Sequence, residues 1–219
     1  MSNDNNNNRT ARSTTTFACL NIRSLLNKFE DVDELCRDRD IDLLALTESW
    51  HDADSPVLGR LRRAGYSVVD RARPRTADDM VNHGGIVVIA RSNVAVSPIA
   101  IADQPSTFEV VCLRAVIGQF TAAVVVLYRR PGSQSVPQKF FDELAAILDR
   151  VATHQEAIYI VGDFNIRLDR TDDTYADQLR LLVDCYGLVL HDTEPTHQLN
   201  RRCCTAVNVF WNETAFPPL

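Results

Sequence analysis

The chain reads AIYIVGDFN from Ala157 to Asn165, an apolar run that ends in a Gly-Asp-x-Asn motif. The run 157–161 predicts a short buried strand. In an extended chain alternate side chains share a face, so we expect Asp163 and Asn165 to point the same way. A carboxylate in that position can take a proton from water, and an amide can donate to a charged oxygen. The pair therefore suits attack on a phosphodiester.

Apolar runs and helical periodicity predict the elements on either side of this stretch. We expect strands at 17–20, 41–46, 66–70, 86–90, 94–99, 108–116, 120–128, 188–191 and 205–211, and helices at 29–38, after Pro137 and at 173–186. Many short strands with helices interspersed indicate an α/β (α+β) fold. The predicted architecture is a four-layer sandwich, in which two mixed β-sheets pack face to face with helices on the outside.

The length of 219 residues predicts one domain. Residues 1–15 are polar and Asn-rich and are expected to form a disordered tail, because they cannot bury apolar surface. The folded domain is predicted over 16–211, and an irregular tail over 212–219.

The formal charge of −6 excludes nucleic-acid binding by broad phosphate neutralisation. A bound cation and a local group of arginines would have to supply the attraction. Two such groups exist, at 60–63 and 71–75, although a solvated surface would explain them equally well. No apolar run reaches the roughly 20 residues of a membrane span, and no secretory signal is visible. The six cysteines lack framework spacing, which indicates reduced thiols in an intracellular protein without a disulfide-linked partner.

Four predicted strand ends carry polar side chains that could act together. They are Asn21, Glu48, Tyr128 and the Asp163–Asn165 pair. Each has an ordinary structural explanation as well. Asn21 could be a turn residue, Glu48 a cap or an exposed side chain, Tyr128 a core aromatic, and the Asp-x-Asn motif an Asx turn.

In this order, the four strand ends resemble the endonuclease/exonuclease/phosphatase superfamily, and most closely the endonuclease domain of non-LTR (LINE-type) retrotransposons. The resemblance includes the apolar run 42–46 before Glu48, the Gly84-Gly85 pair and the Pro195-Thr196-His197 motif. It spans about residues 16–210.

The resemblance implies a divalent-metal-dependent phosphodiester hydrolase, a DNA-nicking endonuclease of the retrotransposon type. Glu48 would hold Mg²⁺ or Mn²⁺, with Asn21 close to the metal, since hard ions prefer oxygen ligands. Asp163 would orient or deprotonate the attacking water, Asn165 would donate to the phosphate, and Tyr128 would contact the same phosphate through its hydroxyl.

The resemblance also implies duplex DNA as the substrate and a reverse transcriptase region of a longer polyprotein as a partner. An enzyme acting on genomic DNA would be nuclear. The residues expected to face the nucleic acid are Arg23, Arg129, Arg130, Thr196 and His197. The family's usual Tyr-Arg-Pro-Pro-Gly is Tyr-Arg-Arg-Pro-Gly here, so Arg130 either adds a cation or is a neutral turn substitution.

Two family elements are missing near the C-terminus. Asn208 stands where the family has an Asp, and no Ser-Asp-His follows, so a closing strand is expected to be absent. Loss of a positioned acid-base group costs about a hundred- to ten-thousand-fold in rate. Two alternatives to an impaired nicking enzyme follow. One is an inactive remnant that keeps the fold and weak metal or nucleic-acid binding, and the other is a phosphatase acting on a small molecule or lipid headgroup.

Overall fold

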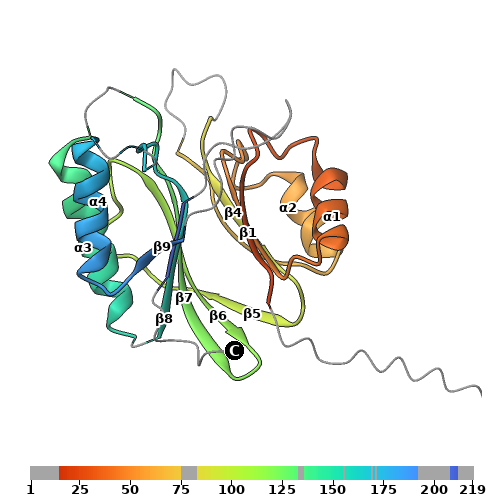
Figure 1. The fold of residues 1–219 in the computed structure, drawn as a ribbon. Coiled ribbons are helices and arrows are strands. Elements are labelled where there is room, and N and C mark those ends of the chain that lie inside the picture. The colour runs from red at the N-terminus through yellow and green to blue at the C-terminus, as the bar shows by residue number, and fades with distance from the viewer. Residues whose placement is uncertain are drawn as a thin grey trace, which may run out of the picture.

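Four layers make up the molecule, with two sheets packed face to face between two pairs of helices (Figure 1). We describe it from a computed structural model. The structure describes residues 15–74, 83–132, 136–154, 156–168, 170, 172–191 and 208–211. The layered α/β sandwich with two mixed sheets confirms the predicted fold class.

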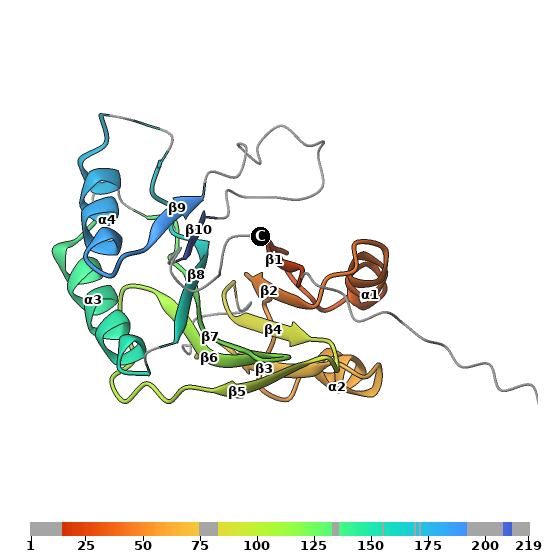
Figure 2. The same ribbon diagram turned by 60° about the horizontal axis from the view of Figure 1, so that its bottom comes forward.

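The smaller sheet has the strand order β1-β2-β4-β3. Its strands are β1 (Phe17–Asn21), β2 (Leu43–Thr47), β3 (Ser67–Arg71) and β4 (Ile86–Ala90). β1 and β2 are parallel, because helix α1 (Phe29–Asp38) carries the chain back between them. β4 runs antiparallel to both of its neighbours. The sheet is therefore mixed, and its outer face is covered by α1 and α2 (Pro56–Arg63) (Figure 2).

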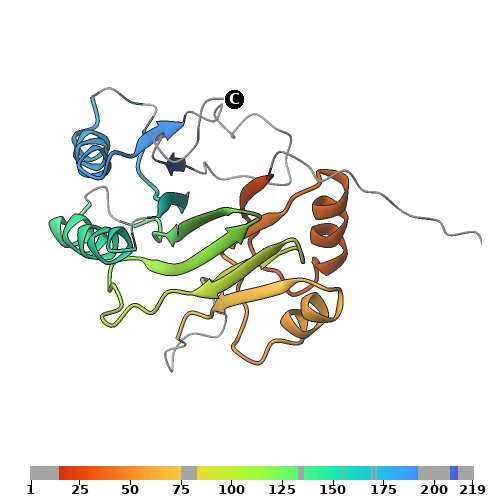
Figure 3. The ribbon, with the colours of Figure 1, turned by 90° about the horizontal axis from the view of Figure 1, so that it is seen from below.

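The larger sheet has the order β5-β6-β7-β8-β10-β9. Its strands are β5 (Val94–Pro98), β6 (Glu109–Ile117), β7 (Phe120–Tyr128), β8 (Ala157–Asp163), β9 (Val189–His191) and β10 (Asn208–Trp211). β7 and β8 are parallel and joined by α3 (Gln138–Ala152), whereas the other pairs are antiparallel. α3 and α4 (Thr174–Asp184) cover its outer face (Figure 3).

Three apolar clusters hold the layers together. One lies between the two sheets and combines β2 and β4 side chains such as Leu43 and Val88 with Leu113 and Val126 of the larger sheet. The second lies under α1 and α2, and the third lies under α3 and α4. Strands buried on both faces explain why β2 and β4 read as unbroken apolar runs.

The predicted elements agree with the observed ones to within two residues at each end, apart from one helix and the last strand. Helix α2 was not predicted, although Pro56 occupies its first turn and Val57, Leu58 and Leu61 are buried along one face. Strand β8 continues through Asp163 rather than ending at 161. The last strand, expected at 205–211, is described only over Asn208–Trp211. The expected absence of a closing strand, and the two predicted tails apart from residue 15, lie outside the described residues.

The described cysteines, Cys19, Cys36, Cys112 and Cys185, are free thiols. Burial raises the pKa of Cys19 and Cys112 to about 12. Cys203 and Cys204 lie outside the described residues. Within the described chain, no helix combines the length and the apolarity that crossing a membrane requires.

Candidate active site

Strand register brings the polar strand ends to one edge of the sandwich. In the smaller sheet Asn21 pairs with Thr47, the residue before Glu48. In the larger sheet Tyr128 pairs with Asp163 on one side and with Glu109 on the other. Because β1 and β2 pack against β8 and β7, these ends converge from both sheets. The structure therefore brings together Asn21, Glu48, Tyr128 and Asp163, which were selected from sequence.

The carboxylate of Glu48 is the centre of this group. Its Oε1 accepts from Asn21 Nδ2 at 2.8 Å and from the Tyr128 hydroxyl at 2.9 Å. The same Asn21 amide nitrogen lies 3.3 Å from Asp163 Oδ2. Asn21, Tyr128 and Asp163 are each only 3% exposed, whereas Glu48 is half-buried. Two carboxylates from different sheets thus share one amide donor in a largely buried setting.

A divalent cation fits the chemistry of these donors. Asn21 Oδ1 is buried without a hydrogen-bond partner, while its amide nitrogen faces both Glu48 and Asp163. An unsatisfied amide oxygen beside two carboxylates is a set of hard oxygen ligands. Among the described residues no group of three or more His, Cys, Asp and Glu forms a ready-made cage, so water or substrate oxygens would complete the coordination.

Electrostatics assign different protonation tasks to Asp163 and Tyr128. Burial raises the pKa of Asp163 above its ordinary value, and the charge of Glu48 raises it further, while hydrogen bonds from Asn165 and Asn21 oppose the rise. A raised pKa makes this carboxylate a better proton acceptor. Burial and the nearby Glu48 also raise the pKa of Tyr128, so its hydroxyl remains a donor.

Asn165 does not follow the extended geometry predicted for it. Its φ is 49°, so the alternation argument that placed it beside Asp163 on one face is wrong. Its backbone N–H instead donates to Asp163 Oδ1 at 3.1 Å, which is the Asx turn that the sequence left open. Its side-chain amide donates to the Arg129 carbonyl at 2.5 Å. The Asx turn therefore orients the Asp163 carboxylate through the hydrogen bond from the Asn165 backbone N–H.

The arginines expected to face nucleic acid divide into two kinds. Arg129 is 8% exposed, and its guanidinium donates to the carbonyls of Phe164 and Asn165, both at 2.6 Å. The Arg129 guanidinium therefore supports the Asx turn from inside the protein, and its contact with nucleic acid stays a prediction. Arg23, which follows β1, and Arg130, which follows β7, are both exposed. Thr196 and His197 lie outside the described residues, as does the side chain of Asn208.

Backbone strain concentrates at this edge. Six described non-glycine residues have a positive φ, and five of them lie in the loops that follow β1, β2 and β8: Arg23, Ser24, Glu48, Trp50 and Asn165. Each such residue costs of order 1–3 kcal/mol, and such strain clusters at functional sites. Backbone hydrogen bonds hold it in place here, including Ser24 N to Glu48 O at 2.8 Å and Trp50 N to Gly84 O at 2.7 Å.

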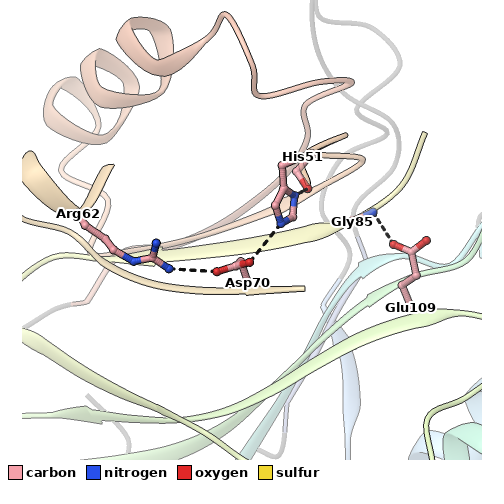
Figure 4. Close-up of polar contacts among 6 residues, drawn as sticks. His51, Arg62, Asp70, Gly85 and Glu109 are labelled. Carbon is pink, nitrogen blue, oxygen red and sulfur yellow. Dashed lines mark hydrogen bonds and ion pairs between the residues drawn. The ribbon is translucent and has the colours of Figure 1, made fainter. Parts of the chain in front are cut away.

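Sequence reasoning missed a second group of polar residues behind the site. Glu109 accepts from the Gly85 amide at 2.6 Å and pairs with Arg73, whose guanidinium lies 5.8 Å from the centre of the Tyr128 ring. Figure 4 shows Glu109 reaching Gly85 across the two sheets. The Gly84-Gly85 pair is part of the sequence resemblance, but Glu109 has no sequence signal because its partners, Gly85 and Arg73, are distant in the sequence.

The sequence matches the Endonuclease/Exonuclease/phosphatase family over residues 18–215, and the chain belongs to that family. A search of curated proteins found no match.

Solved structures similar to this chain share its fold at low identity. The Neisseria 3′ phosphatase NExo, solved with a product DNA hairpin, is 18% identical with a TM-score of 0.62, over 92% of this chain and 88% of that one. TDP2 from D. rerio, solved with a single-strand DNA product, is 12% identical with a TM-score of 0.61, over 94% and 87%. The human Nocturnin catalytic domain, solved with sulfate, is 15% identical with a TM-score of 0.57, over 89% and 81%.

Proposed function

We propose that this chain is a divalent-metal-dependent phosphodiester hydrolase that nicks duplex DNA in the manner of a retrotransposon endonuclease and leaves a 3′-hydroxyl. One observation carries the proposal. The Glu48 carboxylate receives hydrogen bonds from Asn21 and Tyr128 on opposite sheets, with the buried Asp163 carboxylate beside the same amide. Membership of the family supports hydrolysis of a phosphate ester.

Each residue of the site has a role in this reaction. Glu48 and Asn21 would hold Mg²⁺ or Mn²⁺, and the bound ion would supply positive charge to neutralise the phosphate. Asp163, with its raised pKa, accepts a proton from the attacking water. In this structure the Tyr128 hydroxyl donates to Glu48, and the Asn165 amide donates one N–H to the Arg129 carbonyl. With substrate bound, the hydroxyl would turn to the phosphate and the second N–H of Asn165 would donate to it, and such donors can contribute several kcal/mol.

Exposed cations at the edge of the site support a polyanionic substrate. Arg23 follows β1 and Arg130 follows β7, so both lie in loops that adjoin the carboxylates. Two of the structural neighbours were solved with DNA. Duplex DNA is the substrate that we infer, with genomic DNA in the nucleus as the target and a reverse transcriptase region as the functional partner.

An inactive remnant is the second candidate, and the position of Asn208 favours it. Asn208, in β10, pairs with Gly162 of β8, the residue before Asp163. The resemblance expects an Asp at position 208. If that loss abolishes activity, the Asn208→Asp variant should gain nicking.

Conversion of supercoiled plasmid to open circles in Mg²⁺ tests the proposal. We expect the wild type to nick, EDTA to stop it, and Asp163→Ala to lower the rate by at least about a hundredfold. Asp184→Asn removes an exposed carboxylate at the end of α4 and should nick at the wild-type rate. Equal nicking by wild type and Asp163→Ala would refute the mechanism. Hydrolysis of a small phosphomonoester without nicking would favour the phosphatase alternative.

A further inference from the structure

A chain of polar side chains runs from the surface of α2 to the segment that follows Glu48. His51 is fully buried, with Nδ1 2.7 Å from Ser49 Oγ and Nε2 3.3 Å from Asp70 Oδ2. Arg62 donates to the other oxygen of Asp70 at 3.1 Å. Figure 4 shows His51 and Arg62 approaching Asp70 from opposite sides. The resemblance and the proposed chemistry give these residues no role.

Hydrogen-bond chemistry orders the protons along this chain. The hydrogen bond from His51 is the largest cause that lowers the pKa of Asp70, so Asp70 is an ionised acceptor at neutral pH. An acceptor at Asp70 requires a proton on His51 Nε2. Nδ1 accepts from the Ser49 hydroxyl when the ring is neutral and donates to that oxygen when the ring is protonated, so the contact is kept in both states. Asp70 thereby fixes the orientation of the imidazole that holds Ser49.

Ser49 is the point at which this chain meets the active site. It lies between Glu48 and Trp50, which both have a φ of 51°. Its backbone N–H donates to the Gly85 carbonyl at 3.1 Å, and its carbonyl accepts from Leu25 at 2.8 Å. With the hydroxyl bound to His51, all of the hydrogen-bonding groups of Ser49 are engaged. This residue therefore anchors a turn whose strain would otherwise be released.

Space around the anchor is as restricted as its hydrogen bonds. Gly85 has a φ of 93°, and a Cβ at this position would lie 2.9 Å from Ser49 Oγ and 3.0 Å from His51 Nδ1. The imidazole and the hydroxyl thus fill the room that a side chain would take. The Gly85 N–H also donates to Glu109 of β6, so Gly85 links the Glu48 turn to the larger sheet.

We propose that His51 is a positioning residue for Glu48. Asp70 orients the imidazole, the imidazole holds Ser49, and Ser49 keeps the Glu48 turn strained so that the carboxylate meets Asn21 and Tyr128. What Glu48 binds rests on the proposed function, but the positioning of its carboxylate does not. Misplacement by about 1 Å can cost a hundredfold in rate, so a residue that never touches substrate can limit activity.

Two mild variants and one control test this role. Ser49→Ala removes a single oxygen, and His51→Asn keeps an amide oxygen near the Nδ1 position while it loses the reach to Asp70. Arg62→Gln changes the exposed end of the same chain, where the Arg62 side chain is 51% exposed. Each variant is measured for Mn²⁺ affinity by calorimetry, for the ¹⁵N resonance of the Asn21 side-chain amide, and for kcat and KM in nicking.

We expect Ser49→Ala and His51→Asn to move the Asn21 resonance, to weaken Mn²⁺ binding about fivefold or more, and to lower kcat roughly tenfold with little change in KM. Arg62→Gln should match the wild type. A loss of melting temperature with unchanged Asn21 resonance and Mn²⁺ affinity in both variants would overturn the positioning role. If the wild type neither binds Mn²⁺ nor nicks, the proposed function fails, and the Asn21 resonance still decides whether His51 positions Glu48.

Discussion

Two consecutive arginines follow β7 and lie in opposite surroundings. Arg129 is buried against the carbonyls of Phe164 and Asn165 and lies 5.7 Å from the centre of the Phe140 ring. Burial lowers the pKa of Arg129, and the charge of Asp163 opposes that change. Arg130 is exposed. Arg129 therefore supports the Asx turn, whereas Arg130 is placed to attract a phosphate backbone.

Methionine at each position should separate these roles. We expect Arg129→Met to lower the free energy of unfolding by about 2 kcal/mol, because two hydrogen bonds from a charged donor are lost. Arg130→Met should leave stability within about 0.5 kcal/mol, but it should reduce DNA affinity and lower the salt slope by about one. Urea unfolding and fluorescence anisotropy measure the two effects. Equal stability of the two variants would contradict the supporting role of Arg129.

Gly162 permits the close approach of β8 to β7 immediately before Asp163. Its φ is 143°, and a Cβ would lie 1.8 Å from the Leu127 carbonyl oxygen. We expect Gly162→Ala to lower the free energy of unfolding by about 3 kcal/mol or more, through overpacking and backbone strain. Gly187→Ala is the matched control, since Gly187 has a φ of 64° with nothing within 4 Å. In urea unfolding the free energy of unfolding of Gly187→Ala should fall by only about 1 kcal/mol. An equal fall in both variants would rule out the clash at Gly162.

At the level of elements, α3 is tied to the loop before β6 by one carboxylate. Glu143 accepts from the backbone N–H and the hydroxyl of both Ser106 and Thr107. Although burial opposes ionisation, these bonds lower the pKa of Glu143 from 4.5 to about 2. A lowered folded-state pKa contributes stability above pH 4.5 that is lost as the pH falls toward 2.

Glu143→Gln should remove this contribution. We expect the variant to be less stable than wild type by about 2 kcal/mol at pH 7, with the difference shrinking between pH 4.5 and pH 2. Thermal unfolding across that range measures it, with Asp142→Asn as a control because Asp142 is exposed on the same helix. A stability difference that does not change with pH would show that the lost packing, rather than the charge, causes the effect.

Sequence periodicity predicted most elements because the strands are buried runs and the helices carry clear apolar stripes. It missed α2 because eight residues that include Gly59 and three arginines give a short stripe in a charged segment. It singled out Asn21, Glu48, Tyr128 and Asp163 because each is a polar side chain at, or within two residues of, the end of an apolar run. The roles of Ser49, His51 and Glu109 could not be predicted, because they depend on contacts with residues far away in the sequence, Asp70 for His51 and Gly85 for Ser49 and Glu109. Asn165 was misplaced because a positive φ is not visible in an apolar pattern.

For the whole molecule, net charge sets a limit on how DNA can bind. A charge of −6 repels a polyanion, and the exposed arginines assigned to the site are only Arg23 and Arg130. A cation held by Glu48 and Asn21 would cancel part of that repulsion at the place where the phosphate must lie. DNA affinity should therefore depend on the metal more than on the protein's own basic side chains.

Binding of a fluorescent duplex by the Asp163→Ala variant, which should not cleave it, tests this dependence. We expect EDTA to reduce the affinity about tenfold or more relative to Mg²⁺. In Mg²⁺ the logarithm of the association constant should fall with the logarithm of salt concentration with a slope of about −2, because two arginines displace about two counterions. Asp184→Asn, in the same background, controls for removal of an exposed negative charge. Metal-independent binding with a slope steeper than about −5 would contradict this view, because it would require a broad basic surface that the charge of −6 argues against.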